Sequence, residues 1–296
     1  MKKTKGLVVL VAMILVMSFT LVGCGTNQSS NSTASPSASS QTTGEKKVEL
    51  IGSTSVTPLA QEIADAYNKD NADVKINIQG VGSAPGIEAA TKGTADIGMS
   101  SRNLEGDETK AGLKEYQIAT DAIAVAVNPS NKVTALTLAQ IGQIFTGKVK
   151  NWKEVGGDDE PIILISREAG SGTRTAFEEL CKLQKDVGNG KKISLVDDAA
   201  PIIADGNGAV KSNVAAKKGA IGYLSLGIVD TTVKKVTVDG VEPTTETASS
   251  GSYKLSRPFL LLTKGEATGE AKNFIDYILS ADGQNLVEKN GYIKVK

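Results

Sequence analysis

Ser166-Arg167-Glu168-Ala169-Gly170-Ser171-Gly172-Thr173-Arg174 is the stretch of the chain that decides its fold. An apolar run, 162–165, precedes it, and Phe177 and Leu180 follow it at helical spacing. This pattern predicts a strand, a tight loop and the N-terminus of a helix. The two glycines allow the backbone to turn sharply and to approach a ligand closely.

The same stretch offers several hydrogen-bond donors to an oxyanion. The first turn of a helix has unpaired N–H groups and the positive end of the helix dipole. Ser171 and Thr173 add hydroxyls, and Arg167 or Arg174 supplies a planar guanidinium. These groups predict a site for a tetrahedral anion. Taken alone, the segment is equally compatible with a turn followed by a capped helix.

Two further segments repeat the order of strand, hydroxyl- and glycine-rich loop, and helix start. Strand 48–51 leads into a loop that contains Ser53 and Thr54, after which Pro58 opens a helix. Strand 74–79 leads into a loop with Ser83 and a helix that continues to about Lys92. In open α/β sheets such loops converge at the carboxyl ends of the strands. The threefold recurrence therefore favours the anion site over the simple turn.

The remaining periodic segments predict a continued α/β pattern. Trp152, the only tryptophan, is expected to pack between elements. Asp239-Gly240 predicts the turn of a hairpin within 233–241. Further strands are expected at 95–99, 121–128, 221–225 and 259–262, and helices at 138–147, 207–218, 266–279 and 281–290.

The composition excludes several classes of function. The chain has 296 residues, with 33 Lys plus Arg against 33 Asp plus Glu, so it lacks the basic excess of nucleic-acid-binding proteins. It contains no histidine, which removes Ser-His-Asp and Cys-His catalysis and histidine metal sites. Gly80-x-Gly82 lacks the third glycine of a dinucleotide fingerprint, and no lysine precedes Thr173 as in a nucleotide P-loop. We therefore expect no cofactor, no metal and no enzymatic activity.

The N-terminus predicts a secretory signal over residues 1–23, with a basic start and an apolar run from Leu7 to Met17. The sequence Leu21-Val22-Gly23-Cys24 resembles a bacterial lipobox, which implies lipidation of Cys24. The alternative is an uncleaved membrane anchor, although the apolar run is short for a membrane-spanning helix. Residues 24–46 are polar and predict a flexible tether. Cys181 is then left unpaired, and we expect it to pack in the core.

Taken together, these motifs resemble the phosphate-binding lipoproteins of bacterial phosphate-specific ABC transporters. The resemblance runs from Val48 to Lys296. It rests on Gly52-Ser53-Thr54, Gly80-Val81-Gly82-Ser83, Ala95-Asp96-Ile97-Gly98-Met99-Ser100, Phe145-Thr146-Gly147-Lys148 with Trp152, Arg167 through Thr173, and Ile221-Gly222-Tyr223.

The resemblance implies a class II periplasmic-binding-protein fold, with two α/β lobes, two crossing hinge strands and the anion in the cleft between the lobes. Lobe 1 would comprise 47–124 plus 258–296, and lobe 2 would comprise 125–257. The crossing strands would be 122–128 and 257–263.

The resemblance also implies which residues bind phosphate. It gives a hydroxyl donor at Thr54 and a backbone N–H donor at Ser55, and adds further contacts at Ser83, Arg167, Ser171, Gly172 and Thr173. At Ser101, which Arg102 follows, the family has an aspartate that accepts the proton of phosphate and so rejects sulfate. A serine accepts this proton only weakly and can also donate, so Asp96 or Asp205 could substitute. At Ala169 some members carry an acid beside the arginine.

The function implied is that of an extracytoplasmic, lipid-anchored monomer that captures inorganic phosphate and delivers it to the transmembrane subunits of an ABC permease. Three alternatives remain open at this point. The chain could bind another oxyanion, such as sulfate, molybdate or tungstate; it could be a phosphoryl hydrolase; or it could be an adhesive surface protein with a vestigial site.

Overall fold

The computed structural model describes residues 46–188 and 191–295, all of which belong to one compact unit, Gly44–Lys296. The predicted signal, Cys24 and almost all of the predicted tether lie outside the described residues. Strand β1 begins at Lys46, so the last residue assigned to the tether belongs to the fold.

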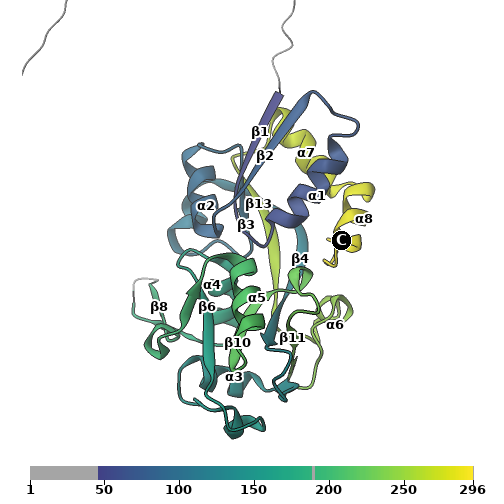
Figure 1. Ribbon diagram of the computed structural model, residues 1–296. Helices are drawn as coiled ribbons and strands as arrows, with labels where there is room; N and C mark the ends of the chain where they lie inside the picture. Colours follow the sequence, from purple (N-terminus) through teal and green to yellow (C-terminus); the bar gives the residue numbers. More distant parts are fainter. Residues whose placement is uncertain (1–45, 189–190, 296) are drawn as a thin grey trace, which may run out of the picture. The chain divides into compact units, whose positions relative to one another are not determined.

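The two ends of this unit build one group of elements (Figure 1). Pro58 lies in the first turn of its helix, as predicted, because its missing N–H costs no hydrogen bond there. The elements are β1 (Lys46–Gly52), α1 (Thr57–Tyr67), β2 (Val74–Gly80), α2 (Ser83–Lys92), β3 (Ile97–Ser100), β13 (Ser256–Lys264), α7 (Gly269–Leu279) and α8 (Ala281–Lys289).

The middle of the chain builds the second group, drawn mainly in teal and green in Figure 1. Its elements are β5 (Ala135–Leu136), α3 (Leu138–Phe145), β6 (Ile163–Arg167), α4 (Gly172–Leu180), β7 (Gln184–Asp186), β8 (Lys192–Ser194), β9 (Ile202–Ala204), α5 (Gly206–Ala216), β10 (Ala220–Ser225), β11 (Lys234–Lys235), β12 (Thr237–Val238) and α6 (Thr245–Ser249).

One long strand, β4 (Leu113–Val127), joins the two groups. Its first part, up to Ala122, pairs antiparallel with β13, and its last part, from Ile123, pairs antiparallel with β10. The resulting strand order is β2-β1-β3-β13-β4-β10-β6-β9, in which β1–β2, β1–β3, β6–β10 and β6–β9 are parallel. β4 begins eight residues before the predicted strand, because its first half is partly exposed and therefore lacks a continuous apolar run.

The hydrophobic cores separate in the same way. One cluster contains residues 48–119 and 259–292 and includes Phe259 and Phe274. A second contains residues 122–255 and includes Trp152, Phe177 and Tyr223. Each of the two groups of elements therefore has its own hydrophobic core, which is the organisation of a two-lobed α/β fold. Trp152 is 1 % exposed, as predicted, and its Nε1 donates to the Gly219 carbonyl (2.9 Å).

The predicted hairpin at 233–241 is wrong. Asp239 and Gly240 do adopt positive φ angles (49° and 78°), as a tight turn requires. However, only one isolated bridge, Val238–Val241, closes this turn. The flanking segments pair elsewhere, β11 antiparallel with β4 and β12 parallel with β5. This pairing accompanies burial of the valines in and beside these strands, Val233, Val236 and Val238.

Candidate anion-binding site

Three loops from the two lobes meet at one place, as the sequence predicts. They follow β1, β2 and β6 and lead into α1, α2 and α4. The Ala84 amide donates to the Gly170 carbonyl (3.0 Å), and the hydroxyls of Ser55 and Thr173 lie 2.9 Å apart. The structure therefore brings the three hydroxyl- and glycine-rich loops into direct contact.

Gly172 is required for this close approach. A Cβ atom at this position would lie 2.2 Å from Ser83 Oγ and 2.9 Å from Ser101 Oγ, which is far inside van der Waals contact. The absence of a side chain allows the N-terminus of α4 to reach the serine hydroxyls of the other lobe.

Arg167 lies at the end of β6 and is 1 % exposed. Its Nε and Nη2 donate to the Glu168 carboxylate (2.7 Å each), and Nη2 also donates to Thr54 Oγ1 of the other lobe (3.0 Å). Its remaining Nη1 is buried and has no hydrogen-bond partner among the described residues. A buried guanidinium N–H without an acceptor is costly, so this atom marks where an anion would be stabilised.

Glu168 is an acid directly beside Arg167, next to Ala169, the position at which some members of the family carry an acid. Burial acts to raise the pKa of Glu168, but the hydrogen bonds and charge of Arg167 outweigh it and hold that pKa below its ordinary value. In this chain the carboxylate that pairs with Arg167 is therefore that of Glu168.

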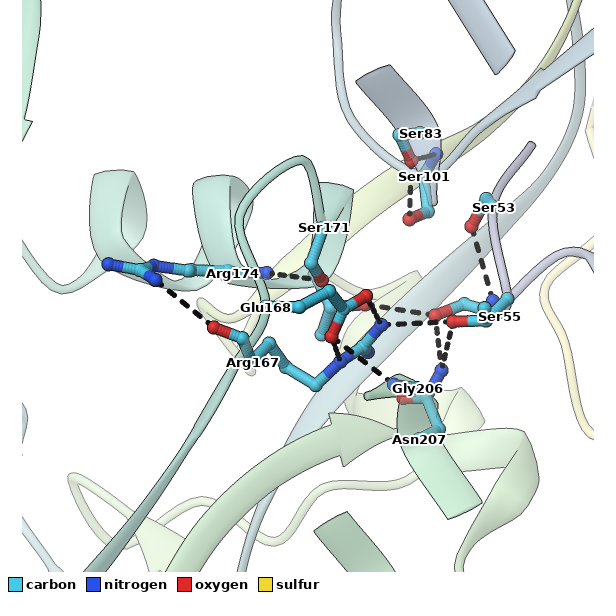
Figure 2. A network of polar contacts seen from close by, with 12 residues as sticks. Ser53, Ser55, Ser83, Ser101, Arg167, Glu168, Ser171, Arg174, Gly206 and Asn207 are labelled. Carbon is cyan, nitrogen blue, oxygen red and sulfur yellow. Dashed lines mark hydrogen bonds and ion pairs between the residues drawn. The ribbon is translucent and has the colours of Figure 1, made fainter. Parts of the chain in front are cut away.

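Thr54 and Ser55 present their hydroxyls between the two lobes. Asn207, the second residue of α5, donates through Nδ2 to Ser55 Oγ (2.9 Å) and to Thr54 Oγ1 (3.3 Å). Figure 2 shows Ser55, Asn207 and Arg167 turned toward one another. The Ser55 amide, the donor implied by the resemblance, instead donates to Ser53 Oγ (3.2 Å), so the hydroxyl of Ser55 is the group that faces the site.

Ser83 and Ser101 form a pair on the lobe-1 side. The Ser101 amide donates to Ser83 Oγ (3.1 Å), and the two hydroxyl oxygens lie 3.4 Å apart. The neighbouring Arg102 turns away and pairs with Glu108 (2.6 Å), so it stabilises its own loop rather than the site.

Arg257 is a residue of the site that the sequence did not reveal. It is the second residue of β13, and its Nη1 donates to Ser101 Oγ (3.1 Å) and its Nη2 to Ser55 Oγ (3.0 Å). Asp121 on β4 pairs with its Nη2 (2.9 Å), and the two side chains are 1 % and 0 % exposed. Burial raises the pKa of Asp121, and the Arg257 charge opposes this shift. The sequence did contain one signal for this pair, because Asp121 and Arg257 are ionisable residues next to the apolar runs of two strands, and such residues often belong to functional sites.

The N-terminus of α4 completes the set of donors. Ser171 caps the helix, and its Oγ accepts from the Arg174 amide (3.2 Å). The amides of Gly172 and Thr173 have no partner among the described residues, as expected for the first turn of a helix. The Arg174 side chain extends away from Ser55 and Asn207 in Figure 2 and donates to Glu178, Asp197 and the Arg167 carbonyl.

The predicted site residues therefore gather at one point: Thr54, Ser55, Ser83, Ser101, Arg167, Ser171, Gly172 and Thr173. The two suggested substitute acceptors do not join them. Asp96 is exposed and accepts from the Glu49 amide (2.8 Å), and Asp205 is an exposed residue that precedes α5. Within residues 46–188 and 191–295, no cluster of three or more His, Cys, Asp or Glu side chains could hold a metal ion.

Comparison with known proteins agrees with this geometry. Residues 34–282 match the model of the PBP superfamily domain. The phosphate-binding protein PstS of Bacillus subtilis is 35% identical over 302 residues, covering 100% of this chain and 95% of that protein. PstS of Borreliella burgdorferi is 32% identical over 257 residues, covering 85% of this chain and 91% of that protein. A candidate phosphate ABC transporter substrate-binding protein of Clostridium perfringens was solved with bound phosphate and is 46% identical to this chain. The match covers 85% of this chain and 100% of that chain, with a TM-score of 0.78.

The two lobes and the donor-lined junction between them define a binding protein of the two-lobed periplasmic-binding-protein fold. Within that class, the chain belongs to the PBP superfamily and to the family of the PstS phosphate-binding proteins. These relatives are binding proteins and not enzymes, in agreement with the prediction from the missing histidines.

Proposed function

We propose that this protein captures inorganic phosphate between its two lobes and delivers it to the permease of an ABC transporter. The observation that carries this proposal is Nη1 of Arg167, which is buried and has no partner among residues 46–188 and 191–295, while Nη2 of the same guanidinium donates to Thr54 Oγ1 of the other lobe (3.0 Å). The Clostridium perfringens relative, 46% identical, was solved with bound phosphate, which supports the choice of anion.

The proposed phosphate ligands come from both lobes. Thr54, Ser55, Ser83 and Ser101 act from lobe 1, for which we propose 47–124 plus 258–296. Arg167, Ser171, Gly172 and Thr173 act from lobe 2, for which we propose 125–257. An anion held by both sets favours the closed arrangement, because it binds that arrangement better than an open one. The closed form is then the state that docks on the permease.

Isothermal titration calorimetry with inorganic phosphate tests this function. Arg167→Lys keeps a positive charge but loses the guanidinium fork, and we expect binding to weaken by at least ~1.5–3 kcal/mol. The matched control is Arg102→Lys, which changes another buried arginine whose partner is Glu108. Absence of any heat of phosphate binding in the wild-type protein would refute the proposal.

We further propose that the protein is a monomer outside the cytoplasm, held at the membrane by lipid on Cys24. None of the helices among the described residues is long and apolar enough to cross a membrane. The proposal rests on the sequence of the signal and of the lipobox. Labelling cells with a fatty-acid analogue should mark the wild-type protein and leave Cys24→Ala unlabelled. Equal labelling of both proteins would exclude this anchor.

A further inference from the structure

Asn207 is a residue of the proposed lobe 2 whose side chain reaches across to lobe 1. Its Nδ2 donates to Ser55 Oγ (2.9 Å) and to Thr54 Oγ1 (3.3 Å), in the loop that follows β1 (Figure 2). An amide nitrogen has two N–H groups, so these contacts use both of them. Asn207 is 2 % exposed and has no side-chain N–H left for an anion. Its side chain therefore acts on binding through the two hydroxyls.

The orientation of the Asn207 amide is fixed from within lobe 2. The backbone N–H of Ser225, the last residue of β10, donates to Asn207 Oδ1 (3.1 Å). Since a backbone N–H can only donate, the oxygen of the side chain faces Ser225 and the nitrogen faces the hydroxyls of Thr54 and Ser55. Asn207 thus joins the end of a lobe-2 strand to two hydroxyls of lobe 1.

These contacts belong to a closed ring of buried polar residues, Ser55, Asn207, Ser225, Asp121 and Arg257. Ser225 Oγ donates to Asp121 Oδ1 (2.9 Å). Arg257 Nη2 donates to Asp121 Oδ2 (2.9 Å) and to Ser55 Oγ (3.0 Å). Asp121 and Arg257 lie opposite each other on the paired strands β4 and β13. By contrast, no backbone hydrogen bond of the described residues joins α5 to the loop of Ser55, so the link between Asn207 and Ser55 is the one that separation of the lobes would break.

We propose that Asn207 is a positioning residue that retains the bound anion, because it fastens lobe 2 to the hydroxyls of Thr54 and Ser55 once the lobes have come together. The contact exists only in the closed arrangement, so it stabilises that arrangement relative to an open one. It therefore slows the release of phosphate and leaves the rate of capture by the open cleft unchanged. This inference rests on the proposed function, because it concerns the closing of the same site.

The rates of capture and release separate this role from a purely structural one. Protein loaded with radiolabelled inorganic phosphate and chased with unlabelled phosphate gives the release rate, and division by the calorimetric dissociation constant gives the association rate constant. We expect Asn207→Ala to release phosphate at least about fivefold faster, because two hydrogen bonds are lost, with association within about twofold of the wild type. The matched control is Asn213→Ala, whose amide donates to the Ala209 carbonyl of the same helix (2.9 Å), and both of its rates should equal those of the wild type.

A double-mutant cycle, measured by calorimetry with inorganic phosphate, tests whether Asn207 acts through Ser55. The affinity losses of independent residues multiply, whereas those of residues in contact do not. We expect the loss in the double variant Asn207→Ala with Ser55→Ala to be at least about threefold smaller than the product of the two single losses. The control cycle combines Asn207→Ala with Ser83→Ala, because Ser83 bonds to Ser101 and not to Asn207, and here the losses should multiply.

The outcomes separate this inference from the proposed function. Thermal unfolding without phosphate shows whether each variant is folded, and Asn207→Ser replaces Asn207→Ala in both experiments if the alanine variant is not. An unchanged release rate, or losses that multiply with those of Ser55→Ala, would overturn the inference, while phosphate binding by the wild type leaves the proposed function standing. If the wild-type protein binds no phosphate, the proposed function itself fails and the inference fails with it.

Discussion

Gly172→Ala is expected to block closure of the two lobes without unfolding either of them. The added Cβ would lie 2.2 Å from Ser83 Oγ, 2.8 Å from Ser83 Cβ and 2.9 Å from Ser101 Oγ. Since these atoms belong to the opposite lobe, the steric clash is avoided with the least strain if the two lobes stay apart. Alanine is well tolerated in the first turn of a helix, so the fold of lobe 2 should persist.

The loss can be estimated from the contacts that closure makes. Three lobe-1 hydroxyls, those of Ser55, Ser83 and Ser101, lie against the N-terminus of α4, and a hydrogen bond to a charged group contributes about 1.5–3 kcal/mol. Losing two of them costs about 3–6 kcal/mol, which weakens phosphate binding by about 100-fold or more.

Calorimetry with inorganic phosphate measures this loss, and thermal unfolding without phosphate checks that the variant is folded. Gly142→Ala in α3 is the matched control, because a Cβ there meets nothing within 4 Å. We expect the control to bind phosphate as the wild type does. Binding of phosphate by Gly172→Ala at wild-type affinity would refute the closed geometry of the site.

Three further predictions concern stability and reactivity. The folded-state pKa of Glu168 lies below its ordinary value of 4.5, so the stabilisation from its ionised form is present above that pH and is lost as the pH falls through the folded-state pKa. The difference in free energy of unfolding between the wild type and Glu168→Gln, measured by urea unfolding, should therefore become smaller in acid. A difference that stays constant with pH would argue against the ion pair. Burial raises the pKa of the Cys181 thiol, so a disulfide reagent should react with it only after unfolding, and rapid reaction of the native protein would show that it is accessible. Trp152→Phe loses the hydrogen bond to the Gly219 carbonyl and should reduce the free energy of unfolding by about 1–3 kcal/mol, with phosphate affinity unchanged; an unaltered urea midpoint would contradict this.

The parts of the site that the sequence predicts are those that are local in the chain. Arg167, Ser171 and Thr173 lie within one strand–loop–helix unit, and the loops of Thr54 and Ser83 repeat the pattern. Each unit has its own signal, because glycine and hydroxyl residues directly follow an apolar run. General rules of α/β sheets then bring the three loops together.

The parts that the sequence did not reveal depend on contacts between distant residues. Arg257 and Asp121 are 136 residues apart, and each is a charged residue that directly precedes an apolar run of its strand. Asn207 is the second residue of α5, in a segment whose sequence predicts only the start of a helix. The hairpin at 233–241 failed for a related reason, since its turn formed as predicted but the strands around it found other partners. Local propensity fixed the turn, and tertiary packing decided the pairing.

β4 changes its partner from β13 to β10 between Ala122 and Ile123, and Arg257 lies opposite Asp121 in the same register. The strand that connects the two lobes therefore also carries Asp121, the carboxylate that holds the Arg257 guanidinium against Ser55 and Ser101. We expect any change in the angle between the lobes at this strand to move that guanidinium and, with it, the serine hydroxyls that it contacts.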